Sequence, residues 1–110
     1  MSLTTNLQAD FLLRKGQSFA EKDKFAEALA AYDKALQKHP DYNLVHLYKG
    51  LTLSRFNKYK EAVASVELAI NSNPSNDIFW YLLGVIHLEH QNYESAIKAL
   101  EQARKSDPSY

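Results

Sequence analysis

Small, aromatic and aliphatic residues recur along this chain with a period of 34 positions. The only three glycines keep this spacing, and so do the only three prolines, two sets of alanines and one set of aromatic residues. These sets are Gly16, Gly50 and Gly84; Pro40, Pro74 and Pro108; Ala28, Ala62 and Ala96; Ala35, Ala69 and Ala103; and Phe25, Tyr59 and Tyr93. Such self-similarity marks a repeat architecture. It predicts three copies at 9–42, 43–76 and 77–110, after a lead-in at 1–8.

Each copy is predicted to form two helices. In the second copy, the first helix is expected at 44–56 and the second at 59–71, where the following Pro74 is a stop signal. The residues predicted to cap the second helices at their N-termini are Asp23, Asn57 and Asn92. One hairpin cannot bury its apolar faces alone, and about three stacked copies are the usual minimum for stability.

The recurring glycines predict a close approach between the two helices of each copy. Glycine inside a helix costs about 1 kcal/mol relative to alanine, so it is expected only where another backbone comes very near. Ala62 and Ala69 are seven residues apart and share one helix face. We therefore expect that face to lie against Gly50, with Tyr59 closing the end of the hairpin.

Composition and charge exclude several classes of partner and site. Thirteen basic residues balance thirteen acidic ones, so nothing in the charge favours nucleic acid or an anionic membrane. The longest apolar run, 78–88, is about half of the roughly 20 residues that a membrane span needs. The chain has no cysteine and its start has no secretory signal pattern, so a cytoplasmic location is expected.

The spacing and identity of the recurring residues resemble the tetratricopeptide repeat (TPR) family. The third copy carries the pattern as Trp80, Leu83, Gly84, His87, Ala96, Leu100, Ala103 and Pro108. The resemblance covers residues 9–110. It implies an all-α, right-handed α-solenoid of three helix–turn–helix units and six helices. In that fold the first helices line a concave groove, where peptides usually bind.

The resemblance also implies which residues face the groove. The groove positions are largely polar in the first copy and mainly apolar in the second and third. A helix that faces solvent on one side should show a polar stripe, and the run 78–88 shows none. Exposed apolar patches usually mark binding sites. The predicted anchors are Leu47, Tyr48, Leu51, Ile78, Tyr81, Leu82 and Val85. These residues predict an adaptor that binds an apolar peptide or helix.

One TPR subtype grips acidic C-terminal peptides with a clamp of lysine, asparagine and arginine side chains. At the five clamp positions this chain has Leu13, Gln17, Tyr48, Ile78 and Leu82. None is the residue type that the clamp requires, so this activity is not expected.

No motif for catalysis, a cofactor or a phosphate loop occurs, so no enzyme is expected. His87 and His90 lie near Glu89, but a metal needs three or four converging ligands. His87 stands where the family has a packing aromatic and is predicted to be a core residue, with His90 solvated. His46 is likewise predicted to be structural.

A second hypothesis is a structural assembly module, a fragment of a larger TPR protein whose apolar faces pack on further repeats or on a second copy. At the C-terminal end Arg104 replaces an aliphatic residue of the other copies, while Tyr93, Ile97 and Leu100 remain apolar. We expect weak self-association through this end or through the groove, most simply as a two-fold dimer.

Overall fold

The computed structural model describes residues 2–107 and contains six α-helices in that range. They are α1 (Leu3–Glu21), α2 (Phe25–Lys38), α3 (Asn43–Arg55), α4 (Tyr59–Ser72), α5 (Asp77–Glu89) and α6 (Tyr93–Ser106). The two helices predicted for the second copy are confirmed to within one residue at each end. Helix α1 begins inside the predicted lead-in. Pro108 and Tyr110, which the repeat pattern places in the third copy, lie outside the described residues.

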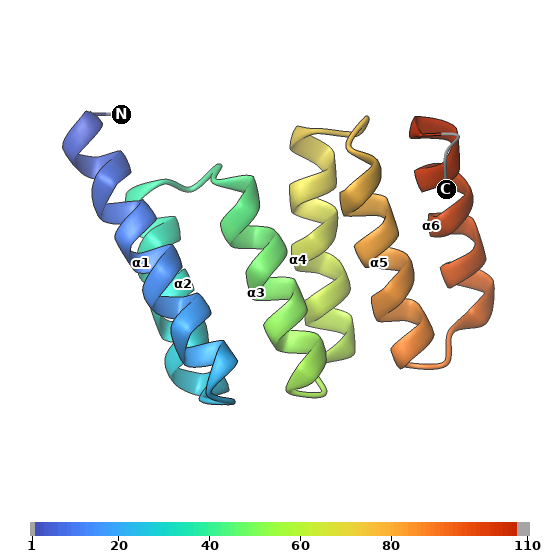
Figure 1. The fold of residues 1–110 in the computed structure, drawn as a ribbon, viewed down its shortest axis with the longest axis horizontal. Helices are drawn as coiled ribbons and strands as arrows, with labels where there is room; N and C mark the ends of the chain where they lie inside the picture. Colours follow the sequence, from blue (N-terminus) through green and yellow to red (C-terminus); the bar gives the residue numbers. More distant parts are fainter. Residues whose placement is uncertain (1, 108–110) are drawn as a thin grey trace.

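The helices form three hairpins that follow one another along the 40 Å axis of the molecule (Figure 1). Within this stack α2 packs against α3, and α4 packs against α5. The first helices also approach their neighbours, α1 to α3 and α3 to α5, whereas among the described residues the second helices do not approach each other. The stack therefore curves, with α1, α3 and α5 on its concave side. The predicted all-α solenoid of three hairpins is confirmed.

The close approach of a second backbone is confirmed at Gly50. A Cβ placed on Gly50 would lie 2.5 Å from Val66 Cγ2 and 3.0 Å from the carbonyl oxygen of Ala62. A Cβ on Gly16 would meet the ring of Tyr32, and one on Gly84 would lie 2.8 Å from Leu100. At Gly50 the obstruction includes the backbone of α4, whereas at Gly16 and Gly84 the nearest atoms belong to a side chain.

The turns inside the hairpins differ from the prediction. Asp23 and Asn57 do not cap the second helices, because each adopts a left-handed backbone conformation with φ near 60°. The amide of Lys58, after Asn57, donates to the carbonyl of Leu53 at 2.8 Å, which is the bond of a Schellman C-cap that ends the first helix. Asn92 is an N-cap as predicted, because its side chain accepts a hydrogen bond from the amide of Ser95.

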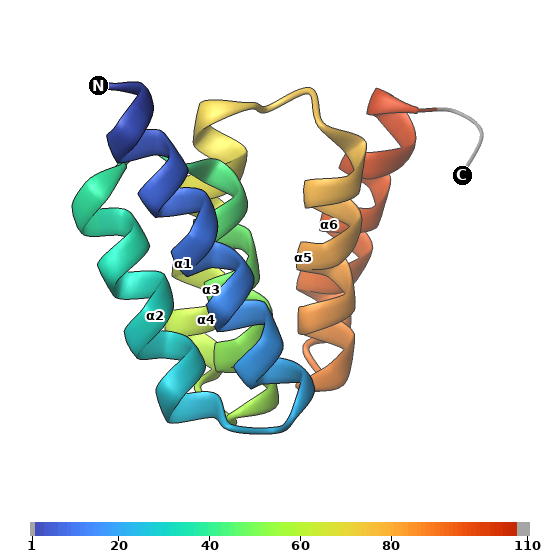
Figure 2. The same ribbon diagram turned by 60° about the vertical axis from the view of Figure 1, so that its left-hand side comes forward.

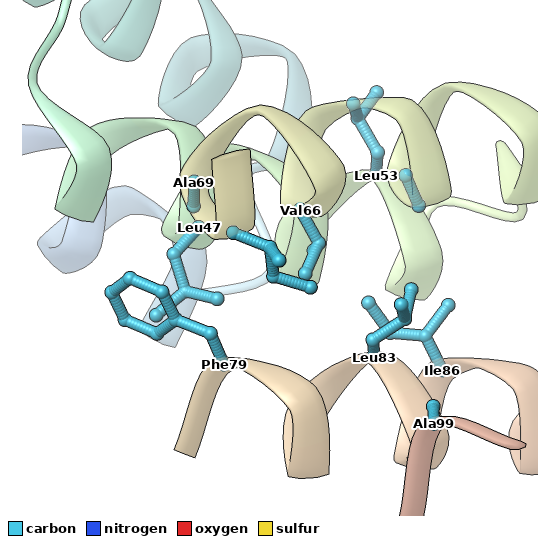
Figure 3. Packing of buried hydrophobic residues seen from close by; sticks show 10 residues of the cluster. Leu47, Leu53, Val66, Ala69, Phe79, Leu83, Ile86 and Ala99 are labelled. Atoms are coloured by element: carbon cyan, nitrogen blue, oxygen red, sulfur yellow. The ribbon is translucent and has the colours of Figure 1, made fainter. Parts of the chain in front are cut away.

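The core lies between the hairpins as well as within them. Phe79, Leu83 and Ile86 point from α5 toward α3 and α4 (Figure 3). Burying an aliphatic or aromatic side chain contributes about 1.5–3 kcal/mol, so each hairpin is stabilised by its neighbour. Two equivalent hydrogen bonds also tie first helices to the preceding loops. His46 Nε2 donates to the carbonyl of Pro40 at 2.9 Å, and Trp80 Nε1 donates to that of Pro74 at 2.8 Å. The predicted structural role of His46 is thus confirmed.

Candidate peptide-binding groove

The concave side of the stack contains a cavity of about 480 Å³. Its lining includes Gln17 and Glu21 of α1, Tyr48, Leu51 and Arg55 of α3, and Glu89 of α5. Helices α1 and α5 do not pack on each other, yet both line this space. The cavity therefore belongs to the groove that the three first helices form together, in which α3 lies between α1 and α5 (Figures 1 and 2).

Arg55 is held at the mouth of the cavity. One guanidinium nitrogen lies 2.6 Å from the carboxylate of Asp23, and the other donates to the carbonyl of Ala20 at 3.2 Å. The guanidinium also lies 5.0 Å from the centre of the Phe25 ring, a cation–π distance. The side chain is still 47% exposed. It therefore presents a positioned positive charge to the groove, and Glu21 and Glu89 line the same cavity.

The floor of the cavity is neutral. Tyr32 and Thr52 line the cavity, and they are 1% and 3% exposed. Burial raises the pKa of Tyr32, so its phenol stays protonated throughout the physiological range. Tyr32 and Thr52 therefore present no charge to a ligand in the cavity.

The groove side of α5 is apolar. Ile78, Val85 and Leu88 lie seven and three residues apart, which places them along one side of the helix. Ile78 is 53% exposed and Leu88 is 44% exposed, while Val85 is half-buried. The opposite side of α5 is occupied by Phe79, Leu83 and Ile86, which face the core. On α3, Leu44 repeats the position of Ile78 and is 39% exposed.

The predicted anchors do not all lie on this surface. The prediction that Leu47 faces the groove is wrong, because Leu47 is 4% exposed and packs beside Phe79 in the core (Figure 3). Its counterpart Leu13 is also buried, in a cluster with Val45. Tyr81, in the same repeat position, is 43% exposed because no helix packs beyond α6 in the described chain. This position therefore contacts the following repeat and does not face the groove.

The other predicted anchors range from half-buried to exposed. Tyr48, Leu51, Leu82 and Val85 are half-buried, and the first three of them also pack against the core clusters. Ile78 is exposed as predicted. Leu44 and Leu88 were not among the predicted anchors. Their exposure makes them part of the candidate site.

The histidines join the second and third repeats. His87 is 8% exposed, and its Nδ1 accepts a hydrogen bond from the Tyr59 hydroxyl at 2.6 Å. That hydroxyl in turn accepts one from Asn92 at 2.9 Å. Burial lowers the pKa of His87, which favours the neutral acceptor. The prediction of a core histidine is confirmed. Tyr59, expected to close its own hairpin, packs against a core cluster that includes Leu53 of that hairpin and also contacts the next one.

His90 is not the solvated residue that was predicted. Its ring stacks on Tyr59 with centroids 4.7 Å apart, and its Nε2 lies 3.1 Å from the hydroxyl oxygen of Ser54. Within residues 2–107 no group of three or more acidic, histidine or cysteine side chains could hold a metal ion. No helix of the described chain is long and apolar enough to cross a membrane.

A family model described as the N-terminal TPR repeats region of Psidin matches residues 18–110. The chain belongs to this TPR family. The match covers most of the three repeats and confirms the resemblance drawn from the glycine, alanine and proline spacing. A comparison with curated protein sequences found no match.

Solved TPR structures share the fold. The first TPR of Spaghetti (RPAP3), bound to the HSP90 peptide SRMEEVD, has a TM-score of 0.85 and 23% identity over 96% of this chain and 83% of that one. The TPR2B domain of yeast Sti1, in its pHsp70 complex, has a TM-score of 0.84 and 20% identity over 94% of this chain and 82% of that one. MamA (41-end) from Desulfovibrio magneticus RS-1 has a TM-score of 0.79 and 25% identity. That match includes 93% of this chain but only 58% of the MamA chain.

Proposed function

We propose that this TPR domain is a protein-interaction scaffold whose concave groove binds an apolar peptide or helix. The observation that carries the proposal is the exposure of Ile78 and Leu88 on the groove side of α5 and of Leu44 at the equivalent position of α3. Large aliphatic side chains in a concave surface can be covered by a ligand, and covering each one contributes about 1.5–3 kcal/mol. A helical or extended segment with regularly spaced apolar residues fits such a groove.

Two structural neighbours support peptide binding in general. The first TPR of Spaghetti was solved with an HSP90 peptide, and TPR2B of Sti1 was solved in a pHsp70 complex. The ligand proposed here differs from the SRMEEVD peptide, because the five positions of the carboxylate clamp carry no lysine, asparagine or arginine. Leu13 among them is buried in the core, so it is not available to a ligand at all.

The polar end of the groove limits how the ligand lies. Arg55, Glu21 and Glu89 line the cavity that α1, α3 and α5 share, whereas the exposed aliphatic residues lie on α3 and α5. We infer that the apolar part of the ligand lies over α5 and that a polar or charged part reaches the cavity. A carboxylate of the ligand would pair with Arg55, and a basic group with Glu21 or Glu89.

A peptide selection tests this proposal. Peptides enriched from a random phage-displayed library on the immobilised chain should carry two or three large apolar residues. In fluorescence anisotropy titrations with the best peptide, Ile78→Lys and Leu88→Lys should each weaken binding at least about tenfold, the effect of losing 1.4 kcal/mol.

The matched control is Leu68→Lys. Leu68 is a leucine on α4, 52% exposed and outside the groove, so this variant should bind like the parent. The proposal fails if both groove variants bind as tightly as the parent, or if Leu68→Lys loses as much affinity as they do.

A further inference from the structure

The N-terminal end of the stack exposes a residue that the internal junctions bury. Phe11, on α1, repeats the position of Val45 and Phe79. Val45 is 0% exposed and Phe79 is 4% exposed, because each packs against the repeat before it. Phe11 is 66% exposed. The outer face of α1 therefore carries the apolar side chain of a repeat junction without its covering surface.

The C-terminal end exposes the other half of the same junction. Ile97 repeats the position of Val63, which is half-buried against the core, and Ile97 is 56% exposed. Tyr81 repeats the position of Leu47, which lies beside Phe79, and Tyr81 is 43% exposed. Helices α1 and α6 lie at opposite ends of the stack (Figure 1). The N-terminal end thus exposes Phe11, and the C-terminal end exposes Tyr81 and Ile97, whose counterparts pack together at the internal junctions.

Charge is complementary between the two ends as well. At the junction of the first and second repeats, Lys49 Nζ lies 2.8 Å from Asp33 Oδ1. Lys15 repeats the position of Lys49 at the N-terminal end, and Glu101 repeats that of Asp33 at the C-terminal end. Stacking one end on the other with the internal spacing would bring this lysine and this glutamate together.

We propose that a second copy of this chain docks head to tail, with α1 of one copy against α5 and α6 of the other. The junction repeats the geometry of the internal ones. Phe11 of one copy covers Tyr81 of the other, Lys15 pairs with Glu101, and α1 covers Ile97. This junction leaves the groove open, since Ile78 and Leu88 lie on its concave side.

This arrangement differs from a two-fold dimer. A head-to-tail junction is heterologous, and it generates an open stack when the rotation between copies does not close. The repeats of this chain already advance along one axis without closing, so further copies would extend the stack. The groove would then run on from one copy to the next.

Two exposed-residue variants distinguish these arrangements. Phe11→Asp blocks the N-terminal end and leaves the C-terminal end intact, while Ile97→Asp does the reverse. In sedimentation velocity at high concentration, the parent should exceed its monomer mass of 12.6 kDa, and each variant alone should stay at that mass. An equimolar mixture of the two variants should form a species of twice the monomer mass and nothing larger, because one intact end from each forms a single junction.

Leu68→Asp is the control, since Leu68 is exposed on α4 away from both ends; it should associate like the parent. Circular dichroism should show all variants folded. Self-association of Phe11→Asp alone would overturn the proposal in favour of a two-fold contact through the C-terminal end. A parent chain that stays monomeric, or a mixture that stays monomeric, would overturn it as well.

Discussion

Replacing Gly50 with alanine should destabilise the chain, although alanine is the better helix former. The replacement gains about 1 kcal/mol of helix propensity. The added methyl, however, would lie 2.5 Å from Val66 Cγ2 and 3.0 Å from the carbonyl oxygen of Ala62. Carbon atoms pack best at about 3.5–4.0 Å, so α3 and α4 would have to move apart by about 1 Å. Overpacking of this kind typically costs 1–3 kcal/mol, and occasionally more.

The obstruction includes the backbone of α4, which cannot change rotamer to make room. We therefore expect the upper part of that range and a net loss of about 1–2 kcal/mol after the propensity gain. For a domain of 60–100 residues, 1 kcal/mol corresponds to a shift of the Tm by about 4–8 °C. Thermal and urea unfolding followed by circular dichroism would measure the loss.

Gly84→Ala is the matched control. Its new methyl would meet the side chain of Leu100 at 2.8 Å, but the nearest backbone atom, the carbonyl oxygen of Ala96, is 3.4 Å away. Leu100 lies on the last helix and can change rotamer, so the variant should stay within about 1 kcal/mol of the parent. The packing argument would be refuted by a Gly50→Ala chain as stable as the parent, or by equal losses at both glycines.

Three further predictions concern the turns, the buried histidine and the clamp. Gln91 has φ 63°, a conformation that costs non-glycine residues about 1–2 kcal/mol, so Gln91→Gly should raise stability by roughly 1 kcal/mol in urea unfolding; a loss would contradict the C-cap assignment. Because burial lowers the pKa of folded His87, the unfolded chain binds more protons in acid, and stability should fall as the pH drops below about 6.5. His87→Leu introduces the residue that the second repeat has at this position, Leu53, and should weaken the pH dependence of stability. An unchanged pH profile in this variant would contradict the assignment of the dependence to His87. The peptide SRMEEVD should show no measurable binding in calorimetry, whereas saturable binding would mean that the clamp comparison is misleading.

The repeat period made most of the fold predictable. Gly50 could be assigned to a close helix approach because a helical glycine is costly unless space requires it, and the structure places it against Ala62 and Val66. The bounds of α3 and α4 followed from the same spacing, since Tyr59 and Pro74 bracket the second helix.

The turn and groove residues were less predictable, for physical reasons. Asparagine and aspartate favour both N-caps and left-handed C-caps, so sequence alone did not reveal that Asn57 ends α3 and does not begin α4. Leu47 and Tyr81 occupy one repeat position, but within residues 2–107 a following hairpin covers only Leu47. The repeat pattern gives the face of the helix, while exposure depends on which neighbours are present.

An NMR titration tests the groove most directly. A ¹⁵N-labelled chain is titrated with the selected apolar peptide, and the shifts of the backbone amides are followed. The account predicts that the largest changes fall on the groove side of α5, at Ile78, Val85 and Leu88, and that Ala64 and Leu68 on α4 stay unchanged. The largest changes on α4, with α5 unaffected, would contradict it.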